Sequence, residues 1–133
     1  MESHPFRILQ HCSELNMSND TANFAAQWPE TMSAFRADAP EITRAFGTMF
    51  QSLMKDGAIS AMHKELIAVA IGVATHCKPC IFAHVEKALK SGATPEQVRD
   101  AVGVAVMMGG GPAYTHAAIA IEAIRHFSAA ATK

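Results

Sequence analysis

Residues 61–92 decide the fold, and they read AMHKELIAVAIGVATHCKPCIFAHVEKALKSG. Ser60 is a suitable N-cap for a first helix that carries Glu65 and the nearly continuous apolar run 66–74. A second helix is expected from the cysteine pair, with Pro79 in its first turn, to Gly92. A helix that is apolar on all sides belongs in the middle of a bundle, so this stretch predicts a central helix hairpin.

Helical periodicity extends toward the N-terminus. We expect a helix over residues 5–15, a break at residues 18–20, and a second helix from Pro29 to about Arg36. The clearest amphipathic segment starts at Pro40 and is stopped by Gly57. Its apolar residues recur at steps of three and four, as one helix face requires: Ile42, Ala45, Phe46, Met49, Phe50 and Leu53.

The C-terminal part is also helical by pattern. Residues 94–97 have the N-cap, first-turn proline and third-position glutamine of a capping box, which opens a helix to about Met108. Residues 109–112, Gly-Gly-Gly-Pro, should break it before a last helix from Ala113 to about Phe127. No stretch alternates apolar and polar residues like a strand, so we predict an all-α fold.

Composition narrows the class of protein. Half of the 133 residues are apolar and 17% are charged, which is typical of a compact globular chain. Eleven basic and twelve acidic residues form no block of like charge, so nucleic acid is not an expected partner. So few charges leave a small chain with little polar covering, and we therefore expect a homo-oligomer.

Neither a membrane span nor a secretory signal is expected. The longest apolar runs, residues 66–74 and 101–113, are shorter than the roughly 20 residues that cross a bilayer. The first six residues lack the basic and apolar regions of a signal peptide, which favours the cytoplasm. Three cysteines in such a chain indicate metal binding or redox chemistry more than structural disulfides.

The cysteine pair has a spacing that supports chemistry. Cys77, Cys80 and His84 are three and four residues apart, so on a helix they share one face. The positive end of a helix stabilises a thiolate and lowers its pKa below the ordinary value of about 8.5, and Lys78 adds a cation. Two thiols this close can also close a disulfide, which resolves an oxidised intermediate.

Glu65 is the expected partner of His84. In an antiparallel hairpin that turns near His76, these residues lie roughly 16 Å before and 12 Å after the turn, at about 1.5 Å per residue. A carboxylate beside a long apolar run needs a polar partner if it is buried. A relay in which His84 takes a proton from Cys80 and Glu65 orients the imidazole then becomes feasible.

These residues carry a family resemblance. Glu65, Cys77-Lys-Pro-Cys80 and His84, followed by Gly109-Gly-Gly-Pro112-Ala113, resemble the AhpD-like alkylhydroperoxidase branch of the carboxymuconolactone decarboxylase family. The resemblance covers residues 41 to about 125 and leaves out the first forty. It implies an AhpD-like helical bundle whose central hairpin carries the cysteines, in a domain of residues 41–133 after a helical extension of residues 1–40.

The resemblance also implies an activity. Members of that branch reduce hydroperoxides without a cofactor, are recycled by an external dithiol protein, and assemble as trimers or hexamers. By position, Cys80 would attack the peroxide, Cys77 would resolve the sulfenic acid, and His84 and Glu65 would relay protons. Helix-end electrostatics alone favours Cys77 as the more acidic thiol, so the two arguments differ on the order. The studied alkylhydroperoxidases carry a histidine where this chain has Pro79, whereas here His76 precedes the first cysteine.

Other interpretations of the same residues stay open. A general thiol-disulfide oxidoreductase would use them on a different substrate. A helical module without enzymatic activity could instead hold a structural zinc, for which Cys77, Cys80, His84 and His76 offer compatible ligands. Cys12 lies in the least organised region and is expected to be a bystander.

Overall fold

The computed structural model describes the backbone of residues 5–131 and the side chains from Asp20 to Ala131. The described chain consists of helices and contains no strand, which confirms the all-α prediction. The helices are α1 (Pro5–Asp38), α2 (Pro40–Met54), α3 (Ala61–Ala74), α4 (Lys78–Lys90) and α5 (Pro95–Ala130).

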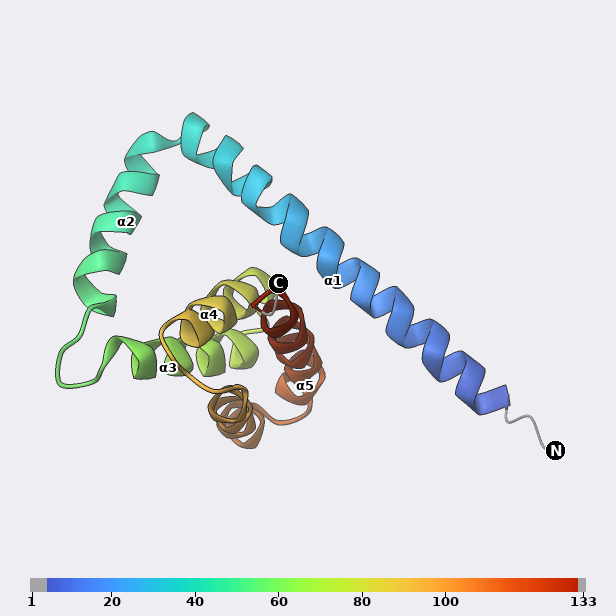
Figure 1. The fold of residues 1–133 in the computed structure, drawn as a ribbon. Helices are drawn as coiled ribbons and strands as arrows, with labels where there is room; N and C mark the ends of the chain where they lie inside the picture. Colours follow the sequence, from blue (N-terminus) through green and yellow to red (C-terminus); the bar gives the residue numbers. More distant parts are fainter. Residues whose placement is uncertain (1–4, 132–133) are drawn as a thin grey trace.

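Helices α3, α4 and α5 form the core, while α1 and α2 extend away from it (Figure 1). The N-caps predicted for α3 and α5 are present: Ser60 accepts a hydrogen bond from the His63 N–H, and Thr94 and Gln97 form both bonds of a capping box. Burial of β-branched side chains from all three helices supplies the main favourable free energy. The largest fully buried side chains are Ile81, Val69, Val73, Val85 and Val98.

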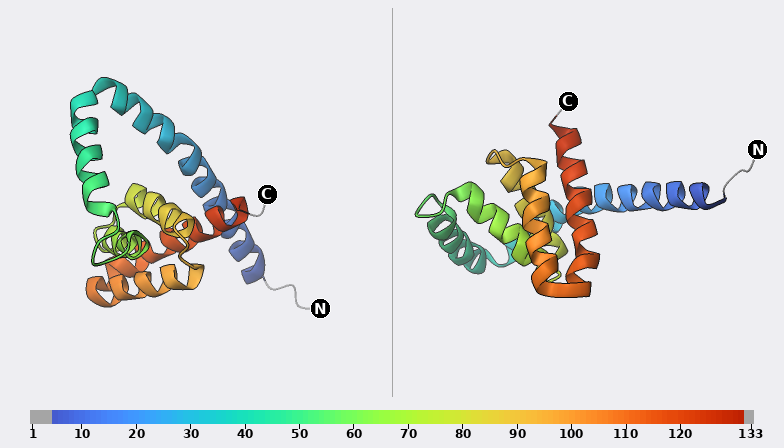
Figure 2. Two further views of the ribbon diagram at one scale, coloured as in Figure 1. Left: turned by 60° about the vertical axis from the view of Figure 1, so that its left-hand side comes forward. Right: turned by 90° about the horizontal axis from the view of Figure 1, so that it is seen from below.

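Helix α5 is two helices joined by a sharp turn. Gly110 has φ 66° and ψ −150°, a backbone conformation open essentially to glycine alone. A Cβ on Gly109 would lie 2.7 Å from the Cβ of Ala113, so the turn has no room for a side chain there. The two halves run back along each other (Figure 2), which confirms the break predicted at residues 109–112.

The turn at Gly110 also limits whether α5 could span a membrane. By length and composition α5 is apolar enough to cross a bilayer. Its first half ends at the Gly110 turn, however, and about 15 residues at 1.5 Å each cover only about 22 Å of a roughly 30 Å hydrocarbon layer. The helix is therefore weak support for a membrane span.

The break predicted at residues 18–20 is wrong, because α1 is continuous from Pro5 to Asp38 and contains Pro29. Ser, Asn, Asp and Thr each lower helix propensity by only about 0.5 kcal/mol, and none of them prohibits the helical backbone. Pro29 removes one backbone donor and costs more, yet the helix continues past it. The low helix propensity of residues 18–20 and of Pro29 is therefore not enough to interrupt α1.

The apolar stripe of α2 does not face the core of its own chain. No residue of α2 is buried, and the helix ends at Met54, three residues before Gly57. Lys64 fixes this end, since its Nζ donates hydrogen bonds of 2.7 Å to the carbonyls of Leu53 and Lys55. Likewise, α3 is not surrounded on all sides as predicted, because Ile67 and Ile71 are exposed.

Candidate active site

The turn between α3 and α4 ends α3 with a Schellman motif. The N–H of His76 donates to the Val73 carbonyl at 3.2 Å, and the N–H of Cys77 donates to the Gly72 carbonyl at 2.9 Å. His76 occupies the left-handed position of the motif with φ 59°, where glycine is usual. Its ring stacks on that of His116 with centroids 4.5 Å apart.

Cys77 and Cys80 form a disulfide at the start of α4, with their Cα atoms 5.2 Å apart. Cys77 is the N-cap of the helix: its Sγ accepts a hydrogen bond of 3.3 Å from the Cys80 N–H. Pro79 lies in the first turn, as the sequence predicted. Both sulfurs therefore lie at a helix N-terminus, where unpaired N–H groups favour negative charge.

Glu65 and His84 meet between α3 and α4. The Glu65 Oε2 lies 2.6 Å from the His84 Nδ1, and the two side chains are only 8% and 18% exposed. The proximity expected from the helix heights is therefore present. Because a carboxylate is an acceptor, Nδ1 carries the proton in this contact, and Nε2 remains free to accept one. His84 lies one helical turn after Cys80.

Gly72 permits the close approach of α3 to the cysteines. A Cβ at this position would lie 3.3 Å from the Ile81 backbone nitrogen and 3.4 Å from the Cys80 Cβ. This is tighter than ordinary packing, so a side chain here would push α4 away from α3. Sequence reasoning missed this role, although a lone glycine inside a long apolar helix is a signal for close packing.

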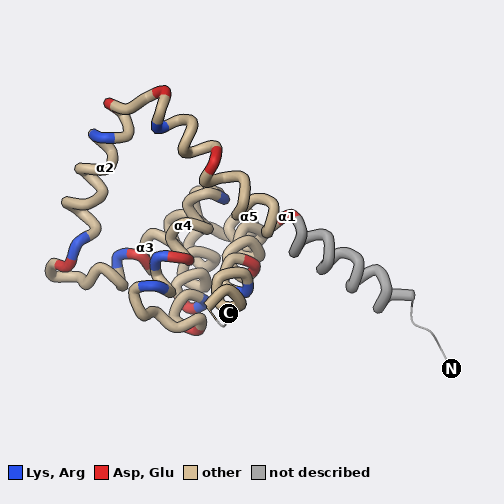
Figure 3. Tube along the Cα trace, turned by 45° about the horizontal axis from the view of Figure 1, so that its top comes forward, with Lys and Arg blue, Asp and Glu red and all other residues tan. Residues whose placement is uncertain are grey.

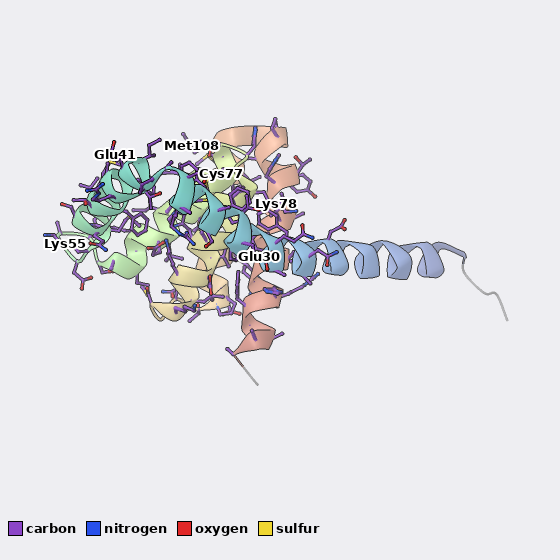
Figure 4. The ribbon with its side chains drawn as sticks, turned by 90° about the horizontal axis from the view of Figure 1, so that it is seen from above. Glu30, Glu41, Lys55, Cys77, Lys78 and Met108 are labelled. Carbon is purple, nitrogen blue, oxygen red and sulfur yellow. A yellow bond between two sulfur atoms is a disulfide. The ribbon has the colours of Figure 1, made fainter. Side chains whose placement is uncertain are left out.

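Aromatic residues from α1 and α2 border the site. The ring of Phe50 stacks on His84 with centroids 6.1 Å apart, and Lys78 Nζ lies 4.6 Å from the ring centre of Phe24. Lys78 thus contacts α1 (Figure 4) and is partly buried. It also lines an open cavity of about 180 Å³ together with Asp20, Thr21, Ile119 and Glu122.

The four residues of the zinc interpretation make other contacts in this structure. Within the part of the chain whose side chains are described, no three His, Cys, Asp or Glu residues are placed to hold a metal ion. The two sulfurs are joined to each other, His84 is engaged by Glu65, and His76 stacks on His116. The side chain of Cys12 lies outside the described residues.

A helix hairpin that carries a Cys-x-x-Cys disulfide and, one helical turn further along, a part-buried Glu–His pair defines a class of all-α proteins with redox-capable cysteines. The sequence profile of the Carboxymuconolactone decarboxylase family matches residues 40–123, and the chain belongs to that family. The chain is also 37% identical to a protein of Cupriavidus necator over 67% of its own length and 88% of that protein. It is 43% identical to protein 4 of the cox locus of Paracoccus denitrificans, over 57% of this chain and 68% of that one.

Solved structures agree with this assignment. An apo carboxymuconolactone decarboxylase family protein from Legionella pneumophila superposes with a TM-score of 0.77 at 37% identity, over 83% of this chain and 98% of that one. A family protein from Thermotoga maritima, suggested to be involved in an antioxidative response, gives a TM-score of 0.64. At 21% identity, over 68% of this chain and 93% of that one, the second comparison shows the fold alone.

Proposed function

We propose that this protein is a thiol peroxidase that reduces hydroperoxides through a Cys77–Cys80 disulfide cycle. The observation that carries the proposal is the 2.6 Å contact of Glu65 with His84 Nδ1, one helical turn from the disulfide. It leaves His84 Nε2 as a base on the helix that carries the redox-active sulfurs. The family includes enzymes, and the suggested antioxidative role of the Thermotoga protein is in keeping with this activity.

In the proposed cycle His84 takes the proton of the Cys80 thiol, and the thiolate attacks the terminal oxygen of the hydroperoxide. The O–O bond breaks, the alcohol leaves with the proton from His84, and Cys80 becomes a sulfenic acid. The Cys77 thiol then loses its proton and attacks the Cys80 sulfur. The disulfide forms, the S–O bond breaks, and the leaving hydroxide takes up that proton as water. An external dithiol protein returns two electrons and two protons, and no metal or organic cofactor takes part.

The order of the cysteines follows the position of the base. His84 is one turn from Cys80, so Cys80 is assigned the attack on peroxide and Cys77 the resolving role. As N-cap, Cys77 has its Sγ near the backbone N–H of Cys80, which favours a thiolate ready to resolve. We place the cycle in the cytoplasm, where dithiol reductants keep such cysteines turning over.

The first experiment counts thiols in the reduced protein before and after one equivalent of an alkyl hydroperoxide. The wild type should rapidly lose two thiols and about 2 Da as the disulfide forms. Cys77→Ser should instead gain about 16 Da as Cys80 sulfenic acid, whereas Cys80→Ser should react slowly. Thiols in the wild type that survive minutes of exposure would refute peroxidase activity. Rapid oxidation of Cys80→Ser would reverse the order of the cysteines.

A general thiol-disulfide oxidoreductase is the second candidate, favoured by the disulfide at a helix N-terminus with Pro79 inside it. The two activities share residues but differ in substrate. A disulfide-bonded protein such as insulin should be reduced quickly by a general oxidoreductase and slowly by a peroxidase. The rates of alkyl hydroperoxide reduction and of insulin reduction, measured at equal enzyme concentration, distinguish the two activities.

A further inference from the structure

Phe50 brings an aromatic ring from α2 to the Glu65–His84 pair. The ring lies at 23° to the imidazole of His84, with centroids 6.1 Å apart. Three residues further along α4, the Nζ of Lys87 lies 4.1 Å from the centre of the same ring. The Phe50 ring therefore covers the stretch of α4 from His84 to Lys87, which lies beyond His84 as seen from Cys80.

The surroundings of Phe50 hold the ring in place and leave room beside it. Lys64 fixes the end of α2 through two hydrogen bonds of 2.7 Å, and Figure 3 shows no charge along the middle of that helix. Phe50 is half-buried, and the side chain of His84 is 18% exposed. Gly47 lies one turn before Phe50 on the same face of α2, and a Cβ there would meet nothing within 4 Å outside its own stretch of helix. The space next to the ring is therefore open.

The order of the reacting groups along α4 sets the direction of the substrate. In the proposed cycle, Cys80 attacks the terminal oxygen of the hydroperoxide, and the other oxygen leaves as the alcohol with the proton from His84. Reacting atoms approach to about 3–3.5 Å, and one helical turn of about 5.4 Å separates the two residues. The leaving oxygen and the organic group bonded to it must therefore extend from Cys80 past His84, toward Phe50.

We infer that Phe50 is a specificity-determining residue, whose ring contacts the organic group of the hydroperoxide while the O–O bond lies between Cys80 and His84. The inference rests on the proposed function and adds the choice of substrate to it. An aryl or bulky alkyl group loses water and gains contact area against the ring. Hydrogen peroxide has no such group and gains nothing from it. The site therefore favours aryl and bulky alkyl hydroperoxides over hydrogen peroxide.

A merely structural role for the ring has a different consequence. If Phe50 only held the imidazole of His84 in place, its removal would slow the reduction of every peroxide by the same factor. If the ring contacts the organic group, its removal slows only those substrates that carry one. The ratio of two rate constants therefore distinguishes the two roles.

The experiment follows thiol loss in the reduced protein by stopped flow, with cumene hydroperoxide and with hydrogen peroxide. The wild type should prefer cumene hydroperoxide by more than about 10-fold. Phe50→Ala should lose on the order of tenfold of that preference, through the rate with cumene hydroperoxide alone. Phe50→Leu retains an apolar side chain and should keep part of the preference. Phe35→Ala, at an exposed position on α1, is the control and should keep the ratio of the wild type.

A second variant tests the same space without removing a contact. Gly47→Leu fills the open volume beside the Phe50 ring, and it replaces glycine by a better helix former, so α2 should stay folded. This variant should react more slowly with cumene hydroperoxide and at the rate of the wild type with hydrogen peroxide. Cumyl alcohol, the product, should inhibit the reaction of the wild type with hydrogen peroxide and inhibit Phe50→Ala much less.

The outcomes separate this inference from the proposed function. Equal slowing with both peroxides in Phe50→Ala would make the ring a support for His84 and overturn the inference, as would an unchanged ratio. A wild type that reduces both peroxides at one rate would also overturn it, while the peroxidase activity would stand. A wild type whose thiols react with neither peroxide would refute the peroxidase activity and this inference with it.

Discussion

Glu65 and His84 show how a buried carboxylate and a ring nitrogen can define a site. Glu65 is 6% exposed as a residue and lies 2.6 Å from its partner, so its charge is compensated by one specific contact. That contact also selects the tautomer that leaves Nε2 free. His76, in contrast, keeps a left-handed backbone where glycine would be relaxed, in exchange for a ring stacked on His116.

Replacing Glu65 by Gln should slow thiol oxidation. The amide keeps the shape of the side chain but cannot stabilise a charged imidazole, so we expect the rate constant for alkyl hydroperoxide to fall on the order of 100-fold. Stopped-flow measurement of thiol loss in the reduced protein gives this rate constant. Glu86→Gln on α4, which only loses a 2.6 Å surface contact with Lys90, serves as the control and should react like the wild type. Equal rates in all three proteins would remove Glu65 from the relay.

Replacing His76 by Gly should stabilise the oxidised protein. Glycine adopts φ 59° without steric cost, so the free energy of unfolding should rise by about 1 kcal/mol despite the lost ring stack. Urea unfolding of the wild type, His76→Gly and His76→Ala measures the difference. His76→Ala loses the ring without relaxing the backbone and should show no gain. If glycine and alanine destabilise the protein equally, the ring contact outweighs the backbone term.

At the scale of elements, two glycines allow helices to approach and reverse. Gly72 brings α3 against Cys80 and accepts the hydrogen bond of the Cys77 N–H through its carbonyl. Gly110 lets α5 double back, which places the two halves of α5 beside α3 and α4 (Figures 1 and 2). Together, these two glycines let α3 and α4, which flank the disulfide, pack closely against the two halves of α5.

The α5 turn makes a paired prediction about glycine substitutions. Gly110→Ala forces a side chain into a glycine-only conformation and should lower the free energy of unfolding by about 1–3 kcal/mol. Gly103→Ala, in a helical and open position of the same helix, should raise it by about 0.5–1 kcal/mol. Denaturant titration of both variants measures the two signs. A neutral Gly110→Ala would mean that the turn relaxes without strain.

At the scale of the whole molecule, a compact three-helix core is joined to two helices that reach outward (Figure 1). Helix α1 touches the core through Phe24, whose ring centre lies 4.9 Å from that of Phe82. Helix α2 then presents its apolar stripe to the outside. We predict that neighbouring copies bury this stripe in the homo-oligomer that the composition indicates.

Association makes apparent stability depend on protein concentration. If the native form is an oligomer, mass action should raise the thermal midpoint of the wild type by several degrees across a hundredfold increase in concentration. Phe46→Glu should unfold at a lower midpoint that does not change with concentration. Differential scanning calorimetry over that range measures both. A midpoint of the wild type that stays constant would argue for a monomer.

Much of the local structure follows from the sequence by itself. Helix caps, the glycine break and the Cys-x-x-Cys at a helix start depend on residues within one or two turns, so their spacing predicts them. Glu65 and His84 could be paired because a short turn between two regular helices restricts which residues reach the same height. The family resemblance also depended on local spacing, that of the glutamate, the two cysteines and the histidine on these two helices. The family profile matches the region that contains them.

Only the tertiary structure decided which faces of the helices meet. The pattern of α2 predicted an apolar stripe but not that it faces away from its own core, because periodicity does not name the partner of a face. Phe50 beside His84 and Phe24 beside Lys78 are likewise contacts between distant segments, which no local spacing encodes. Local hydrogen bonding and helical geometry are properties of neighbouring residues, whereas the packing of helix faces depends on the whole chain.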